Sequence, residues 1–302
     1  MENFRLKVFR TVAEQLNFRK ASELLHLSQP AVSQQVHALE EELGVALFDR
    51  SGSRVQLTPA GAVLLKYARK AARVAADAQE AIARLQGSPG GELRLGASTT
   101  PAQYIVPRML GAFHKQHPRT AVSVLSGNTE RIVTALLNDE ITLGIIEGPA
   151  ASRALHKQLF LKEKLVLIVP KKHPWARSGQ IPFDALSEAS LLLRERGSGT
   201  RRVVELAFRR AGLKLSQLHI SMDLDSTEAI VAGVEAGLGV GFVPERAIAK
   251  ELRLGTLAMV RIGGLEVQRD LTFIRRAGPA LEGAAAAFEQ FALREAQALK
   301  GR

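Results

Sequence analysis

The chain has 302 residues, of which 41 are Lys or Arg and 30 are Asp or Glu, and it contains no cysteine. At about 150 residues per domain, this length predicts two domains, each able to bury a core without disulfides. The absence of cysteine excludes thiolate metal sites and a cysteine nucleophile. Charged residues interrupt the first ten positions, and no apolar run approaches the ~18 residues of a membrane span. We therefore expect a cytoplasmic protein with no signal peptide and no membrane partner.

The formal net charge of +11 is spread along the chain, because residues 1–90 carry +3 and residues 91–302 carry +8. A basic balance favours association with polyanions, but it does not determine a fold. A nucleic-acid site must therefore be argued from where particular side chains lie.

Residues 1–58 contain short helical patterns separated by turn signals. Asn17 and Ser28 each precede such a pattern, and both residue types are preferred helix N-caps. Two short helices joined by a tight turn form a helix-turn-helix. The positions expected to face its core are Ala21, Leu24 and Leu25 on the first helix and Val32, Val36 and Leu39 on the second.

The helix after Ser28 leaves short polar side chains on its outer face, and these can pair with base edges in a major groove. For an isolated helix, a merely solvated face is the more common explanation. Residues 48–50 and 54–58, however, predict a small β-wing whose two arginines lie where phosphate or minor-groove contacts belong. The predicted DNA contacts are Lys20, Ser28, Gln29, Pro30, Ser33, Gln34, His37, Arg50 and Arg54.

Residues 59–86 form one uninterrupted helical pattern, which at 1.5 Å per residue would span roughly 42 Å. Apolar and small residues recur along it with heptad spacing. A helix of this length is too long to bury that seam in its own small domain, although packing on its own helices is the alternative. We expect a dimer interface at Leu64, Tyr67, Ala71, Val74, Ala78 and Leu85.

Residues 87–91, Gly-Ser-Pro-Gly-Gly, interrupt regular structure and predict a hinge. Beyond them, short apolar strands alternate with amphipathic helices to the end of the chain. This alternation predicts an α/β fold with largely parallel sheets, the second of which is expected to begin at residues 165–169.

Polar residues follow several of the predicted strands, at the edge where ligands bind in open α/β sheets. They include residues 98–100, Asn128 and Glu147. Residues 197–200, Gly-Ser-Gly-Thr, open a helix, whose N–H groups attract anions, and Arg201 follows them. Any one of these segments could be only a cap. Together they predict a site for a small anion, which Glu147 would repel unless it pairs with an arginine or the ligand carries a donor.

The N-terminal segments 18–33, 39–44, 47–50 and 57–61 together resemble the winged helix-turn-helix of LysR-type transcriptional regulators. The motifs occur in the family's order over about the first 65 residues. Gln34 stands where the family usually has arginine, so the operator sequence is not inferred. The resemblance also implies dimerisation through the helix at 59–86.

The C-terminal region resembles the family's effector domain, in which two α/β subdomains enclose a cleft as in periplasmic binding proteins. The implied fold class is therefore α+β multidomain. Its expected parts are a winged helix-turn-helix at 1–58, a linker helix at 59–86, a hinge at 87–91 and an effector-binding domain at 92–302, with subdomain I at about 92–163 and 267–302 and subdomain II at about 164–266. The Gly-Ser-Gly-Thr-Arg stretch is similar to that of branches controlling sulfur, nitrogen or carbon assimilation. The cleft residues are expected to be Ser98, Thr99, Thr100, Asn128, Glu147, Ser198, Gly199, Thr200, Arg201 and Phe242.

No signature of an enzyme, a cofactor site or a metal site occurs in the sequence. We therefore predict a sequence-specific DNA-binding transcriptional regulator, homodimeric or homotetrameric, modulated by a small-molecule effector. Two-fold symmetry predicts a pseudo-palindromic operator with half-sites about one helical turn apart, and RNA polymerase is a further candidate partner. The alternative is a cytoplasmic small-molecule binding protein or transferase that uses only the C-terminal fold.

Overall fold

The computed structural model describes residues 3–50, 54–85 and 91–300, and within these ranges it leaves out the side chains of residues 77, 80, 83–85 and 297–300. The chain divides into two compact units, Met1–Pro89 and Gly90–Arg302. The division falls in the predicted hinge at 87–91, of which residues 87–90 lie outside the described ranges. Among the helices that the structure describes, none combines the length and apolar character needed to span a bilayer.

The first unit is a winged helix-turn-helix followed by a long helix, as the sequence predicts. Asn17 caps the second helix by accepting a hydrogen bond from the Lys20 N–H at 3.0 Å, and Ser28 caps the third by accepting one from the Ala31 N–H at 3.3 Å. The elements are α1 (Phe4–Gln15), α2 (Phe18–Leu25), α3 (Gln29–Leu43), β1 (Phe48–Asp49), β2 (Gln56–Leu57) and α4 (Pro59–Leu85).

The buried stripe of α2 differs from the predicted one at Leu24, whose side chain is 56% exposed. Phe18, Ala21 and Ser22 are buried, and Leu25 packs against them. These four residues follow the i, i+3, i+4, i+7 spacing of one helix face, which begins at Phe18 and leaves Leu24 outside it. The Ser22 hydroxyl satisfies its burial by donating to the Arg19 carbonyl at 2.7 Å.

The second unit is built on one mixed sheet with strand order β4-β3-β5-β12-β6-β10-β8-β9, and β11 pairs with β6 and with β7. The parallel pairing predicted from the sequence holds for β3 with β4 and β5, and for β8 with β9 and β10. The strands are β3 (Glu92–Ser98), β4 (Ala121–Gly127), β5 (Leu143–Glu147), β6 (Leu155–Pro170), β7 (Gln180–Ile181), β8 (Ser190–Arg194), β9 (His219–Leu224), β10 (Val240–Pro244), β11 (Leu257–Ile262) and β12 (Val267–Arg276).

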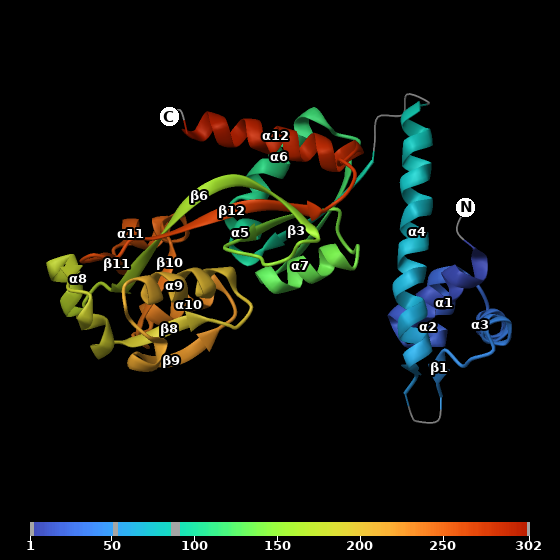
Figure 1. Cartoon of the computed structure of the whole chain (residues 1–302), viewed down its shortest axis with the longest axis horizontal. Coiled ribbons are helices and arrows are strands. Elements are labelled where there is room, and N and C mark those ends of the chain that lie inside the picture. Colours follow the sequence, from blue (N-terminus) through green and yellow to red (C-terminus); the bar gives the residue numbers. More distant parts are fainter. Residues whose placement is uncertain (1–2, 51–53, 86–90, 301–302) are drawn as a thin grey trace. The chain divides into compact units, whose positions relative to one another are not determined.

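The prediction of a second sheet is wrong, because β6 is a strand of 16 residues that joins both halves of the unit in one sheet. It runs antiparallel to β12, and Figure 1 shows the two strands side by side as they cross from one half to the other. The prediction of residues 165–169 found only the apolar end of β6. Its first part carries charged side chains between apolar ones, which conceals the strand in the sequence.

Helices cover this sheet and create hydrophobic cores in each half. In one half α6 and α12 pack against β3, β5 and β12, and α7 packs over a smaller core; in the other half α9 packs against β6, β8, β10 and β11, and α10 packs over a smaller core. Strands β6 and β12 connect the two halves. The helices are α5 (Thr99–Tyr104), α6 (Val106–Gln116), α7 (Thr129–Leu137), α8 (Pro174–Ser178), α9 (Gly199–Arg210), α10 (Thr227–Glu235), α11 (Ala249–Leu254) and α12 (Gly283–Lys300), with 3-10 turns η1 (Asp184–Glu188), η2 (Leu215–Gln217) and η3 (Glu245–Ile248).

Candidate functional site

The outer face of α3 carries the polar residues that the sequence assigned to DNA contact. Gln29, Pro30, Gln34 and His37 are exposed, and Ser33 is half-buried. On the opposite face Val32, Val36 and Leu39 are buried in the core of this unit, as predicted. The helix therefore presents its N-terminal half to solvent with side chains that can donate to and accept from base edges.

The wing is held to α3 by Glu40, a role that the sequence did not indicate. Its carboxylate accepts hydrogen bonds from the Leu47 N–H at 2.8 Å and the Phe48 N–H at 3.2 Å. Arg50 lies 3.5 Å from the same carboxylate, and its guanidinium stands 4.7 Å from the centre of the Phe18 ring. The Arg50 side chain is thus held by contacts within its own unit.

The other two basic residues predicted to contact DNA are exposed to solvent. They are Lys20 on α2 and Arg54 before β2. The tip of the wing, residues 51–53, lies outside the described residues.

Among the side chains of α4 that the structure describes, those in the core lie near its start, where Leu65 and Ala68 are buried and Leu64 packs beside them. Tyr67 and Val74, in contrast, are 59% and 68% exposed. Of the remaining seam residues, Ala71 is exposed and Ala78 is half-buried, and the side chain of Leu85 lies outside the described residues. Packing on its own domain accounts for the first turns of the seam and leaves Tyr67, Ala71 and Val74 uncovered.

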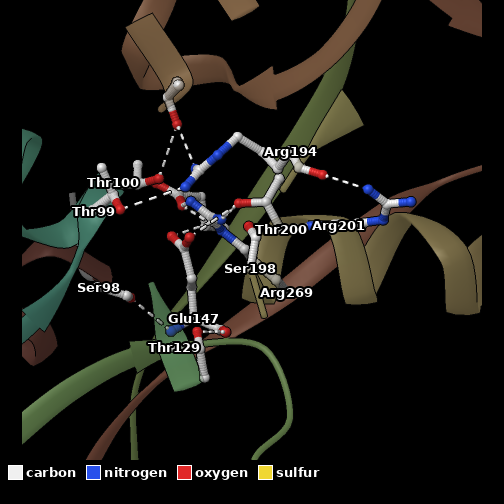
Figure 2. Close-up of polar contacts among 12 residues, drawn as sticks. Ser98, Thr99, Thr100, Thr129, Glu147, Arg194, Ser198, Thr200, Arg201 and Arg269 are labelled. Atoms are coloured by element: carbon white, nitrogen blue, oxygen red, sulfur yellow. Dashed lines mark hydrogen bonds and ion pairs between the residues drawn. The ribbon is translucent and has the colours of Figure 1, made fainter. Parts of the chain in front are cut away.

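In the second unit, the predicted residues Glu147 and Thr200 meet at a buried arginine, Arg269 of β12. Nη1 of Arg269 lies 2.8 Å from Oε2 of Glu147 and donates to Oγ1 of Thr200 at 2.6 Å. The Thr200 hydroxyl in turn donates to Oε1 of Glu147 at 3.0 Å. Figure 2 shows the three side chains converging from β5, α9 and β12. Glu147 therefore meets the condition set by the sequence argument, because its charge is paired with an arginine.

This cluster extends along the crossover strands to Glu163 of β6. Oε2 of Glu163 accepts hydrogen bonds from Nε of Arg269 at 2.8 Å and from Nη2 at 2.5 Å. Arg246 of η3 forms an ion pair with the other oxygen of Glu163. Glu147, Glu163 and Arg269 are buried, and the 37% exposed Arg246 brings the cluster to two carboxylates and two guanidinium groups, so its charges balance. Arg246, Arg269 and Glu163 were absent from the predicted site.

A second set of contacts joins the two subdomains directly. The Thr100 and Thr227 hydroxyls lie 3.1 Å apart, and Nη1 of Arg194 donates to Thr227 at 3.5 Å. Nη2 of the buried Arg194 donates to the Thr99 hydroxyl at 3.4 Å and pairs with Glu195 at 3.2 Å (Figure 2). Hydroxyls and a guanidinium thus meet at the N-termini of α5 and α10.

Tyr104 and Glu228 add a contact near the same interface. Tyr104 lies at the end of α5 and Glu228 in the first turn of α10. Burial, a hydrogen bond to Glu228 and the charge of that carboxylate raise the pKa of the Tyr104 phenol. The phenol therefore stays protonated and donates to Glu228.

Four further predicted residues have local roles at the ends of elements. Ser98 bridges β3 and β5 by donating to the Ile145 carbonyl and accepting from the Glu147 N–H at 3.1 Å. Asn128 and Ser198 are the N-caps of α7 and α9. A Cβ on Gly199 would lie 1.6 Å from the Glu147 carbonyl oxygen, so only glycine allows α9 to approach this closely.

The structure does not bring Arg201 and Phe242 into the polar cluster as contacts for a ligand. Arg201 pairs with Glu205 at 2.9 Å and with Asp223 at 2.7 Å. The Phe242 ring packs edge-on against Phe208 in the core beneath α9, with 5.5 Å between ring centres. Side chains alternate along a strand, and this register turns Phe242 toward that core.

Comparison with known proteins gives matches over both units. Residues 4–62 match the bacterial regulatory helix-turn-helix protein, lysR family, and residues 86–297 match the LysR substrate binding domain. A probable RuBisCO transcriptional regulator of Porphyra purpurea is 34% identical over 272 residues, covering 89% of this chain and 86% of the relative. One of the same description from Synechocystis sp. is 36% identical over 286 residues, covering 94% and 83%.

Solved structures agree with these matches. CbnR, a LysR family transcriptional regulator, superimposes with a TM-score of 0.73 at 28% identity, covering 98% of this chain and 99% of CbnR. A full-length CbnR complexed with its target DNA also gives 0.73. The regulatory domain of Synechocystis CcmR in complex with 2-PG gives 0.63 at 30% identity, covering 69% of this chain and 98% of that domain.

The chain belongs to the LysR family of transcriptional regulators. It is a DNA-binding regulator with an effector-binding domain, and its relatives are regulators and not enzymes. The alternative of a transferase or a free-standing binding protein is therefore wrong.

Proposed function

We propose that the cleft between the subdomains binds a small phosphorylated or carboxylated anion, and that this ligand controls the regulator. The observation that carries the proposal is the buried Arg194, whose guanidinium faces the hydroxyls of Thr99 and Thr227 at the N-termini of two helices. Charge-assisted hydrogen bonds and helix N-termini are the usual means of holding an anion. The likeness to the CcmR domain, which was solved with 2-PG, supports the same ligand class.

The pairing of Glu147 with Arg269 also supports this proposal, because it compensates the negative charge of Glu147. An unpaired carboxylate in the cleft would repel an anion, but here the guanidinium of Arg269 lies 2.8 Å from it. The hydroxyls of Thr100 and Thr227, which lie 3.1 Å apart between the subdomains, can turn their lone pairs and protons to a ligand. A ligand held by both subdomains would bias their closure, and thereby the regulator's response on DNA.

The test is calorimetric titration of the full chain with 2-phosphoglycolate, glycolate and inorganic phosphate. Arg194→Gln is expected to weaken the tightest of these by about tenfold or more, the size of a lost charge-assisted hydrogen bond. Arg202→Gln is the matched control, because Arg202 lies on α9 and is exposed. The proposal fails if none of the three anions binds, or if both variants bind like the wild type.

We further propose that two copies pair through α4 and place two α3 helices on a pseudo-palindromic operator with half-sites about one helical turn apart. Exposed side chains support this proposal, because the seam residues Tyr67 and Val74 are not covered by their own unit. A groove of about 570 Å³ continues the apolar surface toward the winged head, where Val45 and Val63 line it. A tetramer would join two such dimers, and RNA polymerase is the partner we propose for the DNA-bound form.

A further inference from the structure

A cavity in the effector-binding unit lies beside the crossover strand β12, and Arg269 of the buried ion pairs is among the residues that line it. It measures about 750 Å³, within the range of small-molecule pockets, and Gln268, Asp270 and Thr272 of β12 line it. Side chains alternate along a strand, so these three point away from the face that holds Leu271 and Phe273 in the core. The cavity therefore differs from the proposed cleft in the side chains that face it, although Arg269 contributes to both.

Both subdomains contribute walls to this cavity. Helix α9 presents an apolar side made of Val203, Leu206 and Ala207, and Leu265 adds to it. The turn after β5, residues 148–150, closes the other end. An apolar body of moderate size can therefore lie against α9.

The rim of the cavity has an excess of positive charge. Glu266 is paired with Lys164 at 3.2 Å and also accepts a hydrogen bond from Gln268 at 2.9 Å, so its charge is already compensated. Asp270 lies opposite Lys162 in the register of β12 and β6, which balances that pair.

Two further cations line the cavity, and neither has a carboxylate partner in the part of the chain that the structure describes. Lys157 donates to the neutral carbonyl of Ala150. Arg210, in the last turn of α9, has no hydrogen bond or ion pair within the described ranges 3–50, 54–85 and 91–300. An acid group at this rim would meet two uncompensated positive charges.

We propose that this cavity is a second ligand site, which takes an amphipathic monocarboxylate with its apolar body against α9 and its carboxylate on Arg210 and Lys157. The proposal does not depend on the ligand of the cleft, because Arg194 and the hydroxyls around it, those of Thr99, Thr100 and Thr227, are absent from the cavity's lining. Since its walls come from both subdomains, a bound ligand fixes their relative position.

The experiment is fluorine NMR titration of the full chain with 4-fluorophenylacetate, with the neutral 4-fluorophenylacetamide as a probe of the same shape. The acid is expected to bind saturably and the amide at least about fivefold more weakly, because only the acid can form ion pairs with Arg210 and Lys157. Arg210→Ala is expected to weaken the acid by about tenfold. Arg209→Ala is the matched control, since Arg209 is the exposed neighbour that does not line the cavity, and it is expected to bind like the wild type.

Two further variants make the assignment specific. Ala207→Leu fills the apolar wall and is expected to weaken acid and amide alike, whereas Arg194→Gln alters only the cleft and is expected to leave both unchanged within about twofold. The proposal is overturned if the acid does not saturate, if acid and amide bind equally, if Arg209→Ala matches Arg210→Ala, or if Arg194→Gln abolishes binding.

Discussion

Replacing Arg269 by methionine is expected to destabilise the effector-binding unit by about 3–5 kcal/mol, the usual cost of removing one partner from a buried ion pair. Arg269 contacts both Glu147 and Glu163, but Arg246 keeps Glu163 paired. One carboxylate, that of Glu147, is left without a cation, so the estimate counts one broken pair. Adding Glu147→Gln removes this charge, and its amide oxygen can still accept from Thr200. The double variant is expected to recover about half of the loss or more.

The assay is urea unfolding followed by tryptophan fluorescence, because the single tryptophan of the chain, Trp175, packs against the core beneath α9 and reports on this unit alone. Arg276→Met is the matched control, since Arg276 lies on the same strand and pairs with Asp139 at 2.9 Å but is 46% exposed. Exposed pairs contribute about 1 kcal/mol or less. The reasoning is refuted if Arg269→Met costs no more than the control, or if the double variant is as unstable as the single one.

Three further outcomes are expected from other parts of the chain. Gln29→Ala should lower affinity for the operator by about 1–3 kcal/mol with little effect on random DNA, whereas Arg54→Ala should weaken both and flatten the salt dependence; equal losses in a gel-shift assay would contradict these roles. Val74→Lys should give monomers that keep their helical circular dichroism, and a dimer in sedimentation would move the interface elsewhere. Burial lowers the pKa of His173 below its ordinary 6.5, so its contribution to stability is present above that pH and is lost as the pH falls through the folded value. His173→Asn should therefore flatten the fall in urea midpoint between pH 7.5 and 5.5, and an unchanged slope would refute this.

The parts of the fold that depend on local sequence were predictable. Asn17 and Ser28 cap their helices as expected, because each capping hydrogen bond joins residues three positions apart and so depends on the local sequence alone. Leu24 was misplaced because the buried stripe of α2 is decided by which face meets α1 and α3. Strand β6 was found in part, since its pairing with β12 involves residues about a hundred positions away and leaves no local signal.

The candidate site likewise has one part that the local sequence predicted and another part that it did not. Thr100, Glu147 and Thr200 follow strands or open helices, and general rules for ligand sites place such residues at one edge of a sheet. Arg269 and Glu163 lie inside strands, where a charged residue is ordinarily taken to face solvent. Their burial is intelligible only from the register, which sets them directly opposite each other on β12 and β6.

The positive charge available to an anion in the cleft lies at Arg194 and not at Arg201, although both flank the start of α9. Arg201 has carboxylates at 2.9 and 2.7 Å, those of Glu205 and Asp223, so its surroundings already carry more negative than positive charge. Arg194 faces one carboxylate, that of Glu195, and directs its remaining donors at hydroxyls and a carbonyl. Those neutral acceptors can be exchanged for an anionic one, and the exchange is favourable because the anion adds an ion pair to the hydrogen bond that the guanidinium already donates. Arg201, inside the predicted Gly-Ser-Gly-Thr-Arg stretch, therefore anchors α9 to β9. We propose that Arg194, which ends β8, is the residue that discriminates between anionic and neutral ligands.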